Sequence, residues 1–166
     1  PTFDPPGSYQ SGSITLQKTA GPALSVAELG RIDAVLLSHD QHADNLDPAG
    51  RALLTDIPTV LTTRIGAQRL GGKTRGLVPW ETIEINAAGG AKLHVTATPA
   101  RHGPVGIEPI AGDVVGFLLG NEKPGDLIYV TCDTVWYEGV ADVARRFQPR
   151  LVILFAGAAK TRGSFQ

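Results

Sequence analysis

Residues 32–47 read IDAVLLSHDQHADNLD, and this stretch decides how the chain is interpreted. Its first part, residues 32–37, is a short apolar run that predicts a buried strand, and a polar burst follows at once. The burst contains His39 and His42, together with three carboxylates: Asp40, Asp44 and Asp47. Imidazoles and carboxylates are the usual ligands of zinc and similar ions, and a loop at a strand end presents them rigidly. The alternative is a solvated polar loop with an Asx turn, so the stretch alone leaves the metal site open.

Two further segments place a candidate ligand just after an expected strand. His102 lies in PARHGP at residues 99–104, after the alternating run 92–98. Asp133 lies in VTCDT at residues 130–134, at the end of the apolar run 127–131. Three strand ends therefore each offer a potential ligand. The alternatives are a structural histidine at position 102 and an Asp133 that caps the helix expected over residues 140–147.

Short helices and strands are expected through the rest of the chain. Ser25 and Glu28 predict a capping box at the start of a short helix. Further helices are expected over residues 48–55 and 63–70, and further strands over residues 58–62, 81–85, 114–119 and 151–155, the last of them buried. Gly89 and Gly90 suit a tight turn between two strands. The first 22 residues are expected to be irregular, with a brief segment at 14–16 that can pair. The mixture favours sheets packed between helices over a doubly wound sheet.

Composition narrows the class of protein. The 166 residues suffice for one domain of ordinary size, and 42% hydrophobic with 19% charged residues favours a packed core over disorder. Fifteen Lys and Arg against sixteen Asp and Glu give a net charge of −1, which argues against nucleic acid or an anionic membrane as a partner. No apolar run approaches the roughly 20 residues of a membrane span. Cys132 is the single cysteine, so an intramolecular disulfide is excluded and a cytoplasmic location is expected.

The motifs SHDQHADNLD, TPARHG and YVTCDT, in this order and at this spacing, resemble the metallo-β-lactamase fold superfamily of metal-dependent hydrolases. Within it, the resemblance is to the branch that contains L-ascorbate-6-phosphate lactonase and N-acyl-phosphatidylethanolamine phospholipase D. It implies an α+β fold, a four-layer αββα sandwich with metals at one edge of the two sheets. We expect one such domain over residues 1–166. The lack of any methionine, and of any histidine after His102, predicts a fragment of a longer chain, incomplete at both ends.

The superfamily's first motif is His-x-His-x-Asp-His, and this sequence fits it with one residue inserted between the first two histidines. An alignment without the insertion would put Gln41 on a histidine position. With the insertion, the resemblance places His39 and His42 on a first metal and Asp44 on a second. Asn45 then stands where the family has a histidine. Because oxygen donors suit manganese better than zinc, the expected cofactor is one or two divalent ions, Zn²⁺ or Mn²⁺.

The other two motifs complete the implied ligand set, which is His39, His42, Asp44, His102 and Asp133. The resemblance implies a hydrolase that uses a metal-activated water on a small ester, lactone or phosphodiester. Asp44 would be its catalytic residue, orienting the nucleophile and protonating the leaving group. The expected partner is a small-molecule substrate, and a homo-oligomer is left open. The alternative is a non-enzymatic binding or regulatory scaffold with a degenerate second metal site.

Several other residues are expected to be structural. His94 lies inside a strand, and Cys132 is expected to be a small buried hydrophobe. Arg101 either contacts an anionic substrate beside His102 or is solvated, and solvation is expected. Three aromatic residues either wall a pocket or pack in the core, and core packing is the expected role: Trp80, Trp136 and Tyr137. The GGKT tetrad at residues 71–74 lacks the glycine spacing of a phosphate loop.

Overall fold

The computed structural model describes residues 1–11, 14–86 and 88–157, which form three sheets. The first is an antiparallel pair, β1 (Gly7–Ser11) and β2 (Ile14–Lys18). The second is parallel, in the order β3 (Ala34–Leu36), β4 (Thr59–Thr63) and β5 (Thr74–Leu77). The third has the order β10-β9-β8-β7-β6. Its strands are β6 (Thr82–Asn86), β7 (Lys92–Pro99), β8 (Val115–Gly120), β9 (Ile128–Val130) and β10 (Leu151–Ile153).

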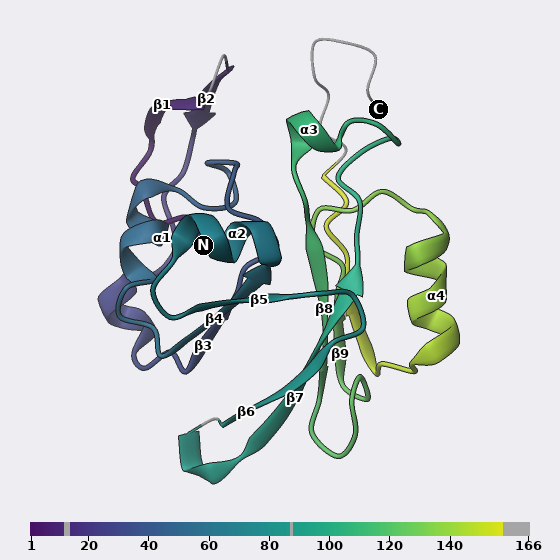
Figure 1. Cartoon of the computed structure of the whole chain (residues 1–166). Helices are drawn as coiled ribbons and strands as arrows, with labels where there is room; N and C mark the ends of the chain where they lie inside the picture. Colours follow the sequence, from purple (N-terminus) through teal and green to yellow (C-terminus); the bar gives the residue numbers. More distant parts are fainter. Residues whose placement is uncertain (12–13, 87, 158–166) are drawn as a thin grey trace.

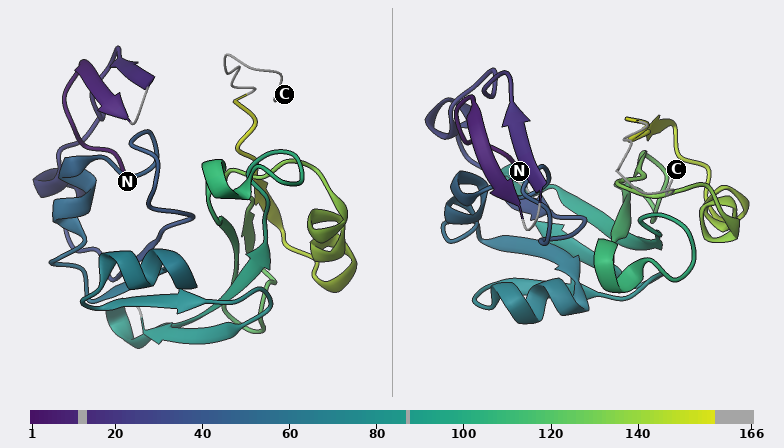
Figure 2. Two further views of the ribbon diagram at one scale, coloured as in Figure 1. Left: turned by 45° about the horizontal axis from the view of Figure 1, so that its top comes forward. Right: turned by 90° about the horizontal axis from the view of Figure 1, so that it is seen from above.

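Helices flank the two larger sheets, and one short helix lies at an end of the five-stranded sheet (Figures 1 and 2). In the described residues the α-helices are α1 (Pro48–Leu53), α2 (Arg64–Leu70), α3 (Glu108–Ala111) and α4 (Glu138–Arg146). Short 3₁₀ turns cover Val26–Leu29 and Ala88–Gly90. Helices α1 and α2 accompany the parallel sheet, and α4 accompanies the five-stranded sheet (Figure 1). Within these residues, no helix combines the length and apolar character that a membrane crossing would require.

The two-residue period of the strands divides the apolar side chains among three packed interfaces. In β4, Leu61 faces the five-stranded sheet, whereas its neighbour Val60 packs with residues around α1. In β8, Phe117 faces the parallel sheet and Leu118 packs against α4. All four side chains are essentially fully buried. Alternate residues of a strand point to opposite faces, so each of these central strands joins two apolar interfaces.

The structure agrees with most of the expected elements and adds three. The short helix at Ser25 begins with Glu28 accepting hydrogen bonds from both the backbone N–H and the hydroxyl of Ser25. Strands β1 and β5 and helix α3 were not expected. Within β5 only Leu77 is buried, so the sequence of this strand has no apolar periodicity that would predict it. Residues 158–166 of the expected domain lie outside the described residues.

The expectation that residues 151–155 form a buried strand is wrong. Among residues 1–11, 14–86 and 88–157, β10 is the last strand of its sheet and pairs only with β9, and its three residues are 44–53% exposed. Leu154 and Phe155, which follow it, are also exposed. An apolar run shows that a segment can form a strand, but it does not distinguish a central strand from an edge strand.

Asp47 fixes the start of α1 and holds the first residues of the chain against it. Its carboxylate accepts hydrogen bonds from the backbone N–H groups of Gly50 and Asp4, each at 2.7 Å, and from the Lys18 ammonium at 3.3 Å. Burial alone would raise the pKa of Asp47, but the hydrogen bonds from backbone N–H groups outweigh it and lower the pKa. Asp47 is therefore a helix cap rather than a candidate metal ligand.

Replacing Asp47 with alanine should lower the free energy of unfolding by about 1–3 kcal/mol, because three buried or half-buried donors lose their acceptor. Urea denaturation at pH 7 measures this. The carboxylate's contribution is fully present above its unfolded pKa of 3.8 and is lost as pH falls through the lowered folded pKa. The gap between wild type and Asp47→Ala should therefore narrow below pH 3.8. Exposed Asp56→Ala is the control, and equal effects at both positions would contradict the assignment.

Candidate metal centre

His39 and His42 stand on the loop that follows β3. Pairing continues one residue past the strand, since the Leu37 N–H donates to the Leu61 carbonyl at 2.8 Å. The His39 side chain is fully buried, and its Nδ1 lies 2.9 Å from the Ser38 hydroxyl oxygen. A proton on Nδ1 donated to that oxygen leaves the Nε2 lone pair directed at His42. His42 is half-buried on the same loop.

His102 and Asp133 face this loop from the five-stranded sheet. His102 follows β7, and Asp133 follows β9. The two segments are tied together because the Arg101 N–H donates to the Thr134 hydroxyl and the Arg101 carbonyl accepts from the Val135 N–H. Helix α4 begins after Tyr137, so Asp133 is not its cap and that alternative is excluded.

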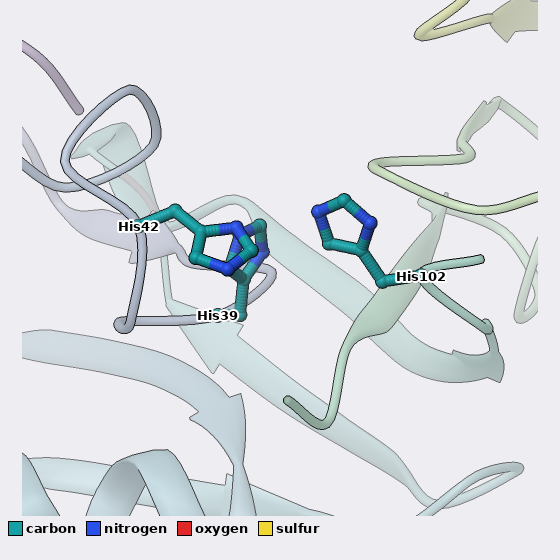
Figure 3. Close-up of side chains that lie close together, drawn as sticks. All are labelled: His39, His42 and His102. Carbon is teal, nitrogen blue, oxygen red and sulfur yellow. The ribbon is translucent and has the colours of Figure 1, made fainter. Parts of the chain in front are cut away.

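Three histidine side chains converge where the two sheets meet (Figure 3). One ring nitrogen from each of His39, His42 and His102 can be chosen so that all three lie within 4.8 Å of one another. His39 Nε2 and His42 Nδ1 are 3.2 Å apart. Two nitrogens bound at zinc–nitrogen distances of 2.0–2.1 Å in a tetrahedral site are about 3.3 Å apart. The donor set and its spacing thus fit a divalent metal ion.

The electrostatics of the cluster favour neutral imidazoles, the form that binds metal. Burial, followed by the neighbouring histidines, lowers the pKa of His39 to about 3. Burial, together with His102, also lowers the pKa of His42. Asp133 brings a negative charge close to two of the rings, since its Oδ2 lies 3.5 Å from His102 Nε2 and 3.9 Å from His39 Nε2. A cation bound between these groups would meet three imidazole rings and one carboxylate.

The remaining loop residues differ in what they contact. Asp44 is exposed and stands outside the three-histidine group, although its charge raises the pKa of His42 against the effect of burial. The Asn45 amide donates to the His39 carbonyl at 2.6 Å. The Asn45 side chain therefore helps to fix the backbone of the loop that carries His39 and His42. His94 stands in mid-strand, paired across to Glu84 and Gly120, away from the three-histidine group.

Two expectations about neighbouring side chains are wrong. The Arg101 side chain is half-buried rather than simply solvated, and its guanidinium carbon lies 4.5 Å from the centre of the Tyr137 ring. Trp136 is 77% exposed and does not pack in the core. Trp80, by contrast, stacks on Phe147.

Cys132 is a small buried hydrophobe, as expected. It is 6% exposed, and burial followed by the charge of Asp133 raises the pKa of its thiol to about 12. Its backbone has φ of +55°, a left-handed conformation that is uncommon for a residue with a side chain. This turn of the backbone occurs directly before Asp133.

A partly buried ion pair that the sequence did not reveal holds the histidine loop in place. The Asp40 side chain is 4% exposed, and Arg69 of α2 donates to both of its oxygens, with Nε at 2.9 Å. Arg51 of α1 donates to the Asp40 carbonyl at 3.1 Å. Asp40 was a candidate ligand by type, but its carboxylate is engaged here. Arg69 is 29 residues distant, so no local pattern could have indicated the pair.

Replacing Arg69 with methionine should lower the free energy of unfolding by about 1–3 kcal/mol, because it leaves the buried Asp40 carboxylate without its partner. The loss should be smaller than for a fully buried pair, since Arg69 reaches solvent. Adding Asp40→Asn to that variant should restore part of the loss, which a double-mutant cycle measures. Arg75→Met, which breaks an exposed pair with Glu81, is the matched control and should cost less. A cycle with zero coupling would refute the role.

Comparison with known proteins places the chain in a family. The model of the beta-lactamase superfamily domain matches residues 3–164. One matching solved structure is a protein of Parabacteroides distasonis ATCC 8503 that is provisionally designated a metal-dependent hydrolase. It is 20% identical with a TM-score of 0.47, over 74% of this chain and 64% of that one, a likeness too distant to inform activity. No curated protein matches the chain. Because the family match spans nearly the whole sequence, this chain belongs to the beta-lactamase superfamily.

Proposed function

We propose that the protein is a metal-dependent hydrolase whose metal is held by His39, His42 and His102. One observation carries the proposal: nitrogens of these three side chains lie within 4.8 Å of one another although they come from the ends of two different sheets. Membership of the beta-lactamase superfamily supports it. The burial that keeps His39 and His42 neutral supports it as well.

A divalent ion held there would act as a Lewis acid and make a water molecule nucleophilic at neutral pH. Asp133 stands beside two of the histidines, where its carboxylate would balance the charge of the ion. Ser38 orients the His39 ring through Nδ1. Asp44 is exposed on the same loop, where it can take a proton from water and return it to a leaving group.

For the substrate we propose a small ester, lactone or phosphodiester, and for the metal Zn²⁺ or Mn²⁺. The sequence resemblance to the lactonase and phospholipase D branch supports this choice. Two cavities of about 310 and 370 Å³ lie beside the ligand loops, one lined by Ser38 and Asp44 and the other by His102, and both suit a small molecule. We extend the family assignment to a single four-layer αββα domain over residues 1–166.

A second candidate, a binding or regulatory scaffold with one metal, is favoured by Asn45. Its side-chain amide donates to the His39 carbonyl, so this position anchors the loop where the superfamily motif has a histidine. Two ions per chain would exclude this candidate. One ion together with hydrolysis would favour a mononuclear enzyme.

Replacing His39 with glutamine should weaken Zn²⁺ binding at least 100-fold, because it removes one of the three imidazole donors of the proposed site. Calorimetric titration of the metal-free chain gives the affinity, and elemental analysis after dialysis gives the number of ions. His94→Gln removes a histidine outside the cluster and should bind as the wild type does. Equal affinity in the His39 variant, or no zinc binding by the wild type, would refute the proposed site.

Replacing Asp44 with asparagine should lower kcat by about 10²–10⁴-fold while the bound metal is retained, because the proton acceptor is removed. The assay uses Zn²⁺- and Mn²⁺-loaded protein with bis(p-nitrophenyl) phosphate and a generic lactone. Asp56→Asn changes an exposed carboxylate on another loop and should leave kcat unchanged. If hydrolysis by the Asp44 variant equals that of the wild type, the residue has no catalytic role.

A further inference from the structure

A cavity of about 370 Å³ opens directly beside His102. Arg64 at the start of α2 lines one part of it, and Pro79, after β5, lines another. Arg101, His102 and Tyr137 line the part that belongs to the five-stranded sheet. A molecule bound there would reach both the candidate metal centre and the Arg101 side chain.

Arg101 is held in this cavity without an anionic partner. Among the described residues, no carboxylate oxygen lies within 4.0 Å of an Arg101 nitrogen, and its buried Nε has no hydrogen-bond partner. Its backbone is fixed by hydrogen bonds with Thr134 and Val135, and its guanidinium lies over the Tyr137 ring. The ring contact offsets only part of the cost of removing a cation from water. A half-buried guanidinium with free donors is suited to an oxyanion, which accepts two parallel hydrogen bonds.

Charges elsewhere in the cavity limit what kind of anion fits. Glu108 and Asp113 also line it, and both are exposed, with Glu108 accepting a hydrogen bond from the Gly106 N–H at 2.8 Å. With Arg64 and Arg101 they bring the charge of the lining close to zero. A group with one negative charge would be attracted by the nearby Arg101, whereas a dianion would also be repelled by the two carboxylates.

We infer that this cavity binds a monoanionic oxyanion, a carboxylate or a phosphodiester, on the Arg101 guanidinium. The inference deepens the proposed function and rests on it, since it assigns the substrate an anionic group placed next to the hydrolysed bond. Arg101 would then set specificity by contacting the substrate, while His102, the next residue, contributes to the metal centre. The two consecutive residues would couple recognition to chemistry.

The test titrates acetate and dimethyl phosphate into the metal-free full chain and follows the Arg101 Nε–H signal by NMR. We expect a saturable shift with at least one of the two anions, and their relative affinities distinguish carboxylate from phosphodiester. Arg101→Gln should weaken binding at least tenfold, and Arg101→Lys should weaken it less because the charge remains. Arg150→Gln, at an exposed position outside the cavity, is the control and should bind as the wild type does. An Arg101 signal that moves with neither anion, or equal binding by Arg101→Gln and wild type, would overturn the inference.

A second arm uses the metal-loaded chain with a pair of esters that differ only in carrying a carboxylate or a neutral amide. Arg101→Gln should reduce the preference in kcat/KM for the anionic ester at least tenfold, mainly through KM. An unchanged preference would overturn the inference. If neither ester is hydrolysed by the wild type, the hydrolase proposal fails, while the metal-free titration still decides the anion site.

Discussion

Apolar packing between the parallel sheet and the five-stranded sheet is the interaction on which the rest of the structure depends. Leu61 and Leu77 from one sheet pack with Val95, Ala97 and Phe117 from the other. His39 and His42 follow a strand of the first sheet, whereas His102 and Asp133 follow strands of the second. The separation of His102 from His39 and His42 is therefore set by the distance between the sheets. A cavity in this core would change that distance, because packed interiors transmit displacement.

In addition to this packing, polar contacts fix the orientation of the loop that carries His39 and His42. Asp40 is held by Arg69, Asn45 holds the His39 carbonyl, and Ser38 bonds to the His39 ring. Of the three histidines, only His39 takes part in these contacts. Asp40 and Asn45, which have the chemistry of metal ligands, thus hold the loop in place instead. The rigidity that a preformed metal site needs comes from these buried polar contacts.

The strands and the histidines could be predicted from the sequence because their signals are local. Apolar periodicity indicated most strands, and three motifs at strand ends indicated the cluster. What could not be predicted depends on contacts between distant residues. Asp40 and Asp47 have the chemistry of ligands. Asp40 is engaged by Arg69, 29 residues away, and Asp47 by the Asp4 N–H, 43 residues away, in addition to the Gly50 N–H of the helix that it caps. The environment of Arg101 likewise depends on Tyr137, which lies on a separate segment. For β10, the apolar sequence does not show that this strand lies at the edge of the sheet formed by the described residues.

The left-handed backbone at Cys132 links the middle of the core to the metal-binding edge. A residue with a side chain adopts this conformation at a cost of about 1–3 kcal/mol, so the surrounding packing must hold it there. Its buried side chain lies in the same apolar cluster as Phe117 and Val115, and the next residue is Asp133. The direction of the Asp133 carboxylate is thus maintained by hydrophobic contacts rather than by the preference of the local backbone. Substitutions at these apolar positions would consequently change the direction of the Asp133 carboxylate and with it the chemistry of the site. Function can therefore be tuned from the interior between the two sheets, without replacing a polar residue.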